Sequence, residues 1–206
     1  MRRVHVDSDH WNFTLEGTGE TISPIGGNIV NDQHPGQGTV FDRWNAADVD
    51  RRLGLMAELG MNCLRQAIGI NRVFDARTGL KAEGLRNWDA FLGLCERHGI
   101  YVMAVGGYPG GNDWFDVERL ADQGANLEDS TAFWRAFARH NAGNPAIWAW
   151  DLRNELLFWP RAHMVTPGSP DEVRVAAMIA DRWPRWLEVK YGSVAAMNRT
   201  LRKSAP

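Results

Sequence analysis

AIWAWDLRNEL, residues 146–156, is the stretch of sequence that most directly indicates the fold. Residues 146–152 form an apolar run of the kind found in a strand buried on both faces. The run ends in Arg153, Asn154 and Glu155. Comparable runs begin near positions 25, 62 and 100, with a helical pattern between successive runs. This alternation predicts βα units and a parallel sheet.

Three helices are expected between these runs. The first begins after Asn45, a good N-cap, and ends at Gly60. The second ends at Gly99, and the third begins at Ser130 and stops before Asn144-Pro145. Each has an apolar stripe at helical spacing. The stripes are Val49, Leu53, Met56 and Leu59; Leu85, Trp88, Leu92 and Cys95; and Phe133, Trp134, Phe137 and Ala138.

Length and composition exclude several classes of protein. The chain has 206 residues, a formal net charge of -2, 44% hydrophobic residues and 23% charged residues, an ordinary globular composition. The near-neutral balance argues against a nucleic-acid partner or a polybasic membrane patch. No apolar run reaches the ~18 residues of a membrane span. The N-terminus lacks a signal-peptide pattern, so the expected location is the cytoplasm.

Polar side chains follow two of the expected strands. In parallel α/β folds, groups that act on ligands lie at the carboxyl ends of strands. Arg65 follows the second strand, and Asn154 and Glu155 follow the fourth. Burying a carboxylate costs free energy unless it is paired, whereas at the rim of a pocket it can serve as a general acid. Asn154 can bind a sugar hydroxyl, and Arg65 can hold a nearby carboxylate ionised.

Several segments resemble a known group of enzymes. AIWAWDLRNEL is similar to the fourth-strand signature of clan A glycoside hydrolases, in which the strand ends in Asn-Glu. Most of the chain resembles the cellulase-like enzymes of glycoside hydrolase family 5. The later segment WPRWLEVKYGSVAAMNRT (183–200) resembles the segment after strand four in family 42 β-galactosidases. The family 5 resemblance is carried by GGN (26–28), FDRWNAADVDRRLGLMAELGMNCLR (41–65), HGIYVMAVGG (98–107), YPGGND (108–113) and FWRAFARHNAGNPAIWAWDLRNE (133–155).

The resemblance implies an α/β fold of the (βα)8 TIM-barrel type and hydrolysis of β-glycosidic bonds by a retaining mechanism. Glu155 matches the acid/base position, Asn154 the residue that binds the sugar 2-hydroxyl, and Arg65 the arginine that orients the nucleophile. A β-linked oligosaccharide or glycoside is the implied partner, and no cofactor is implied. At strand three, where many relatives carry a histidine, residues 106–108 read Gly-Gly-Tyr.

The second catalytic carboxyl group is missing from this pattern. In these families the nucleophile is a Glu after strand seven, and retaining hydrolysis needs two carboxyl groups about 5–5.5 Å apart. A full barrel typically takes about 250 residues. Here Glu155 already follows strand four, and the later acids lie on helical patterns. We therefore expect only about the first four βα units in this chain, and no activity of the chain alone.

We expect residues 1–206 to form a single partial barrel domain. Residues 1–24 are predicted to be an N-terminal β element, with a turn at 7–10. Residues 25–160 hold βα units one to four. Residues 161–206 form a helical excursion after strand four, with a helix starting at Ser169-Pro170, an interruption at Pro184, and a last short helix capped by Ser193.

Aromatic residues after the strand ends are candidate sugar contacts. These are Trp114, Trp159 and Tyr108, whose rings can stack on sugar faces. The histidines show no metal-ligand spacing, so no metal is expected. His98 and His140 fall at the ends of predicted helices, where contact with the helix dipole is the simpler explanation. Cys63 and Cys95 lie in apolar patterns and are expected to be small core residues rather than a disulfide.

Other interpretations of the same residues remain open at this stage. One is that Arg65 pairs with Glu155 or Asp151 for structural reasons. A non-catalytic carbohydrate-binding module is another. A homodimer is a third, because four parallel strands leave two unpaired edges, and such edges associate readily.

Overall fold

The computed structural model describes residues 1–29, 39–106, 123–152, 168 and 170–201. Its contacts divide the chain into two compact units, which are described separately below. The first unit is Met1–Trp114 with Leu127–Glu155, and the second is Phe115–Asn126 with Leu156–Pro206.

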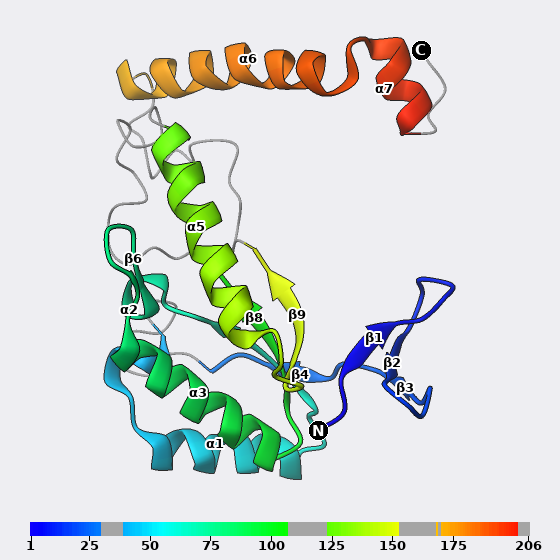
Figure 1. Ribbon diagram of the computed structural model, residues 1–206, viewed down its shortest axis with the longest axis vertical. Coiled ribbons are helices and arrows are strands. Elements are labelled where there is room, and N and C mark those ends of the chain that lie inside the picture. The colour runs from blue at the N-terminus through cyan, green and yellow to red at the C-terminus, as the bar shows by residue number, and fades with distance from the viewer. Residues whose placement is uncertain (30–38, 107–122, 153–167, 169, 202–206) are drawn as a thin grey trace. The chain divides into compact units, whose positions relative to one another are not determined.

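A parallel sheet forms the centre of the first unit (Figure 1). Its strand order is β4-β5-β8-β9, and each strand runs parallel to its neighbours. The strands expected near positions 25, 62, 100 and 146 are thereby confirmed. Their bounds are β4 Gly26–Gly27, β5 Cys63–Ala67, β8 Tyr101–Val105 and β9 Ile147–Asp151.

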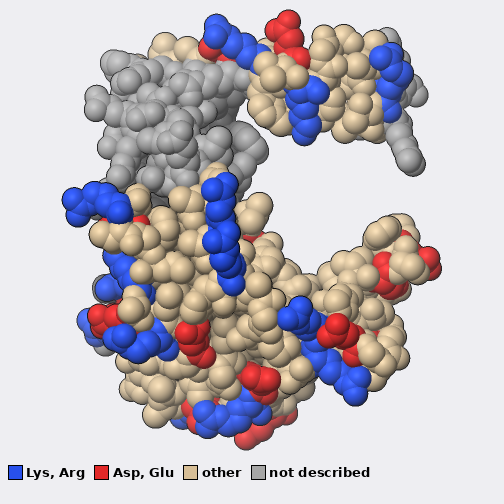
Figure 2. All heavy atoms as spheres, in the orientation of Figure 1, with Lys and Arg blue, Asp and Glu red and all other residues tan. Residues whose placement is uncertain are grey.

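Helices connect successive strands of this sheet, as expected for βα units. They are α1 (Ala46–Glu58), α3 (Ala82–Arg97) and α5 (Gln123–Asn141). In Figure 2 acidic and basic side chains are interspersed around α1 and α3, so this face carries mixed charge.

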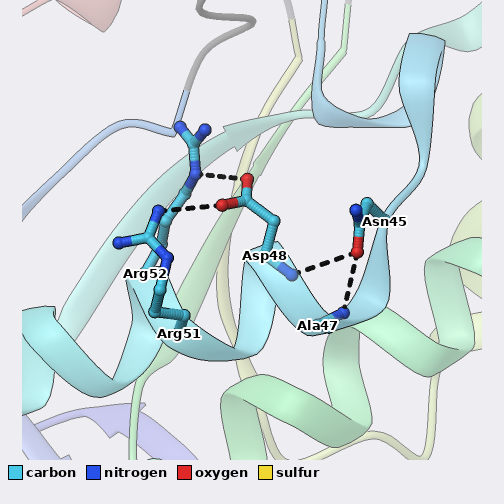
Figure 3. Close-up of polar contacts among 5 residues, drawn as sticks. All are labelled: Asn45, Ala47, Asp48, Arg51 and Arg52. Atoms are coloured by element: carbon cyan, nitrogen blue, oxygen red, sulfur yellow. Dashed lines mark hydrogen bonds and ion pairs between the residues drawn. The ribbon is translucent and has the colours of Figure 1, made fainter.

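The start of α1 follows the expected N-cap (Figure 3). The Asn45 side-chain oxygen accepts hydrogen bonds from the backbone N–H groups of Ala47 and Asp48, both at 3.1 Å. Asp48 in turn pairs with Arg51 at 2.8 Å and with Arg52 at 2.7 Å. These hydrogen bonds from the two arginines hold the pKa of Asp48 below its usual range. The Asn45 cap therefore sets the start of the helix.

The main core lies between the sheet and the helices. Leu64 of β5 and Val102 and Ala104 of β8 face this core. The predicted apolar stripes of the helices contribute Val49 and Leu53 of α1, Trp88, Leu92 and Cys95 of α3, and Phe133 and Phe137 of α5, all buried. Burial of this apolar surface is the main stabilising contribution to the unit.

A small antiparallel sheet packs against the opposite face of the parallel sheet. Phe13 lies edge-on to Trp148, with ring centroids 4.9 Å apart. The Tyr101 hydroxyl donates to the backbone oxygen of Arg2 at 2.8 Å. The expected N-terminal β element is thus present, and Thr21–Ile22 adds a third strand that the sequence did not indicate. Its strands are β1 Val4–Val6, β2 Phe13–Leu15 and β3 Thr21–Ile22.

Both cysteines are buried and unbridged, as expected. Cys63 lies at the start of β5, beside Tyr101 and Trp148. Burial raises the pKa of the Cys63 thiol, and the Trp148 indole partly opposes that shift. Burial also raises the pKa of Cys95. Both thiols therefore stay protonated near neutral pH, when they are least reactive.

Each histidine at a helix end has a carboxylate partner, so the dipole is not its main contact. His98 Nε2 lies 2.6 Å from Asp50 Oδ1, and this contact links α3 to α1. His140 Nε2 lies 2.8 Å from Asp89 Oδ1, and this contact links α5 to α3. The hydrogen bond from His98 is the largest cause that lowers the pKa of Asp50.

Two helix boundaries differ from the prediction. Helix α5 begins at Gln123 rather than at Ser130. A serine caps a helix only where its own backbone is not helical, and Ser130 lies inside α5. Helix α6 (Pro170–Tyr191) continues through Pro184, where an interruption was expected. Proline removes one helical hydrogen bond, which a helix of this length can lose without ending.

Four short elements, one before α1 and three between β5 and α3, were also missed. They are η1 (Val40–Arg43, before α1), α2 (Ile70–Val73), β6 (Phe74–Asp75) and β7 (Gly79–Leu80). β6 and β7 form a two-residue-long antiparallel pair. Elements this short have no periodicity to detect.

The second unit contains α6 and α7 (Val194–Thr200). The predicted Ser193 cap is confirmed, since its hydroxyl accepts from the Ala196 N–H at 3.1 Å. The Lys190 ammonium lies 4.5 Å from the centroid of the Trp186 ring. Among the described residues, no helix is long and apolar enough to cross a membrane.

Gly84 shows how closely the helix layer is packed. An added Cβ would lie 2.6 Å from the carbonyl carbon of Arg72 and 3.0 Å from the Cα of Val73, both backbone atoms of α2. Gly84→Ala is therefore expected to lower the free energy of unfolding by about 3 kcal/mol, measured by urea denaturation. Gly93→Ala on the same helix has nothing within 4 Å and is expected to raise it by up to about 1 kcal/mol. Equal effects of the two substitutions would contradict this packing.

Candidate active site at the carboxyl ends of the strands

An ion pair joins Arg65 of β5 to Asp151, the last residue of β9. Arg65 was expected to follow its strand, but it lies inside β5, which continues to Ala67. The Nε and Nη2 atoms of Arg65 both donate to Oδ2 of Asp151, at 3.2 and 2.6 Å. The two side chains are partly exposed, at 38% and 26%. Because all neighbouring strands are parallel, their carboxyl ends meet at one edge of the sheet. The pair therefore marks the edge where ligand-binding groups of α/β folds are found.

Strand register places this pair on the face of the sheet away from the main core. Arg65 is aligned with Met103 of β8, and Asp151 with Val105. Leu64, Val102 and Ala104, whose side chains alternate with these, belong to the main core. Successive side chains of a strand point to opposite faces. The Arg65 side chain consequently reaches across β8 to meet Asp151.

A register shift in β9 is what brings Asp151 to this face. Val102 is aligned with Ile147, but Met103 is aligned with Ala149, so one extra residue is accommodated there. Without that shift Val105 would oppose Trp150, and Asp151 would point to the helices. In the structure Trp150 instead packs on Trp134, with ring centroids 5.8 Å apart. Irregularities of this kind re-aim side chains and are frequent near active sites.

The end of β8 is shaped by a glycine. A Cβ at Gly106 would overlap the ring of Trp134 of α5. The Gly106 N–H donates to the Asp151 carbonyl at 2.8 Å, which extends the pairing of β8 and β9 to their carboxyl ends. Gly106 thus allows α5 to pack closely at the edge of the sheet that carries Arg65 and Asp151.

Arg65 is the one predicted site residue that the structure describes. Glu155, Asn154, Trp114, Trp159 and Tyr108 lie outside the described residues. The pairing of Arg65 with Asp151, one of the interpretations left open by the sequence, is observed. Within the described part of the chain, no group of three or more metal-ligating side chains gathers.

Solved structures similar to this chain include glycoside hydrolases. An exo-β-1,4-mannosidase from Opitutaceae bacterium strain TAV5 matches with a TM-score of 0.61 and 22% identity, over 87% of this chain and 33% of its own. A family 5 glycoside hydrolase from Bacteroides vulgatus matches with a TM-score of 0.51 and 16% identity, over 87% and 36%. The chain therefore has the fold of part of a (βα)8 barrel like those of these enzymes.

Further comparisons define the extent of this partial barrel. A hyperthermostable endocellulase matches with a TM-score of 0.51 and 17% identity, over 87% of this chain and 53% of its own. The partial barrel thus spans about a third to a half of the length of these structures. No protein-family description and no curated protein sequence matches the chain. The expected fold, the first βα units of a (βα)8 barrel, is confirmed.

Proposed function

We propose that this chain is part of a retaining glycoside hydrolase that acts on β-linked sugars, with Glu155 as its acid/base residue. The observation that carries the proposal is the Arg65–Asp151 pair at the carboxyl edge of the sheet. Asn154 and Glu155 follow Asp151 in the sequence by three and four residues. The names of the similar structures, a β-1,4-mannosidase and an endocellulase, support β-mannosides and β-glucans as substrate classes.

The proposed reaction divides its steps between this chain and a carboxylate outside it. Glu155 protonates the leaving oxygen while the second carboxylate attacks the anomeric carbon. Glu155 then takes a proton from the water that hydrolyses the glycosyl-enzyme. Asn154 binds the sugar 2-hydroxyl, and Arg65 orients the attacking carboxylate. Trp114, Trp159 and Tyr108 offer faces on which sugar rings stack.

Strand pairing supports a larger assembly. In the described sheet β4 pairs with β5 alone and β9 with β8 alone. We propose that further strands of a barrel pair at these two edges. The self-association of half-barrels and the cytoplasmic location expected from the sequence stay predictions, and light scattering of the purified chain tests the first.

Hydrolysis assays test the proposed function. The 206-residue chain alone is expected to release no more nitrophenol from aryl β-mannosides and β-glucosides than its Glu155→Gln variant, because the nucleophile is proposed to lie elsewhere. Turnover by the chain that Glu155→Gln abolishes would show that the chain has its own nucleophile.

A completed barrel provides the positive test. In it, this chain is joined to the part of the Opitutaceae mannosidase that lies beyond the matched region, and circular dichroism checks its folding. We expect this completed barrel to hydrolyse an aryl β-glycoside. A folded but inactive completed barrel would contradict the proposed function.

A further inference from the structure

The Arg65–Asp151 pair has a geometry that simple charge pairing does not require. The two residues lie on strands separated by β8, and Arg65 is aligned with Met103 while Asp151 is aligned with Val105. The Arg65 side chain therefore extends across the middle strand, β8. Its guanidinium meets Asp151 at the next aligned row of residues on this face, nearer the carboxyl ends of the strands. The Nε and Nη2 atoms of Arg65 both donate to the same oxygen of Asp151, Oδ2. Contacts from two nitrogens to one oxygen restrict both the position and the plane of the guanidinium.

Among the described strand residues on this face, Asp151 is the acid beside the Arg65 guanidinium. Of the described strand residues on this face, the register rows contain Met103 and Val105 between the two partners, and Ala67 and Ala149 beside them. None of these four carries a charge. The register shift in β9 is also needed, because it directs Asp151 rather than Trp150 to this face.

Stability alone is a weak explanation for the pair. Both side chains are partly exposed, at 38% and 26%, and ion pairs at such positions contribute little to the free energy of unfolding. Ordering a long arginine side chain across a strand also costs conformational entropy. The pair and the register shift that creates it are better explained by a need to hold the guanidinium in one place.

We propose that Asp151 is a positioning residue that fixes Arg65 at the carboxyl edge of the sheet and affects the reaction only through Arg65. This assignment rests on the proposed function, in which Arg65 orients the attacking carboxylate. It also unites the two interpretations of Arg65 that the sequence left open. The contact with Asp151 holds the Arg65 guanidinium in the position that its proposed role requires.

The first test uses the 206-residue chain itself. The probe is the Arg65 Nε–H signal in an NMR spectrum of protein labelled with ¹⁵N-arginine, assigned with Arg65→Lys. Asp151→Asn is expected to increase the hydrogen-exchange rate of this group at least tenfold. Asp75→Asn is the matched control, since Asp75 accepts from the backbone N–H groups of Arg77 and Thr78 in a separate hairpin. Unchanged Arg65 exchange in Asp151→Asn would overturn the proposal.

The second test uses the completed barrel. Asp151→Asn is expected to lower kcat about 10²-fold, the loss typical of a small misplacement of a catalytic group, with KM within twofold. In an Arg65→Ala background the same substitution is expected to cost nothing further. Multiplied losses in the double variant would show that Asp151 acts independently of Arg65 and would overturn the proposal.

The two tests separate this proposal from the proposed function. A folded completed barrel that is inactive even with the native Arg65, Asp151 and Glu155 counts against the proposed function. The NMR measurement on the chain still decides in that case whether Asp151 fixes Arg65.

Discussion

Trp88→Ala is expected to lower the free energy of unfolding by about 3–5 kcal/mol, a large part of the stability of a domain of this size. The Trp88 ring is fully buried and packs on Phe41, Phe91 and Phe137, with centroid distances of 5.2–5.6 Å. Its Nε1 atom donates to Asn141 Oδ1 at 2.9 Å. The substitution therefore removes a large ring and leaves the buried Asn141 amide oxygen without this donor.

Two further variants separate these contributions in the same urea denaturation experiment. Trp88→Phe keeps most of the ring volume but removes the donor to Asn141, and is expected to cost about 1–3 kcal/mol. Trp11→Ala is the matched control, because Trp11 is 87% exposed, and its effect is expected to stay within about 0.5 kcal/mol. A Trp88→Ala variant as stable as Trp11→Ala would contradict the assignment of Trp88 to the centre of the core.

Glu155→Gln in the completed barrel is expected to lower kcat by about 10²–10⁴-fold on an aryl β-glycoside with a poor leaving group. Glutamine keeps the shape of the side chain but cannot give up a proton to the leaving oxygen. With dinitrophenolate, which leaves without protonation, the first step should be affected far less. The measurement is the initial rate of phenol release from both substrates.

The matched control for this prediction is Glu188→Gln. Glu188 lies exposed on α6, so its replacement makes the same change of charge at a residue with no role in the proposed reaction. Its kcat is expected to stay within twofold of the parent barrel. Equal rates for Glu155→Gln and Glu188→Gln with the poor leaving group would exclude Glu155 as the general acid.

Local patterns in the sequence were sufficient to predict the order of strands and helices. A cap such as Asn45, a stop such as Gly60 and an apolar stripe each depend on residues within one element. The boundaries that were wrong depend on more distant context. Ser130 has the right chemistry for a cap, but its preceding backbone is helical, and Pro184 lies in a helix long enough to retain it.

The candidate site was predictable in part. The position of Arg65 near the end of a buried run indicated the edge of the sheet that its side chain reaches, whereas Asn154 and Glu155 lie outside the described residues. The sequence could not show that Arg65 pairs with Asp151, because this contact depends on the register of β9 against β8. A shift of one residue changes the face to which every later side chain points, and the shift between Val102 and Met103 leaves no local signal in the sequence.

The anomer released first by the completed barrel tests the proposed retaining β-glycosidase most directly. Proton NMR of the reaction, recorded before mutarotation, distinguishes the two anomers of the free sugar. Two successive displacements at the anomeric carbon, with Glu155 as acid and then as base, predict that the β-anomer appears first. The α-anomer as first product would contradict the retaining mechanism and the role assigned to Glu155.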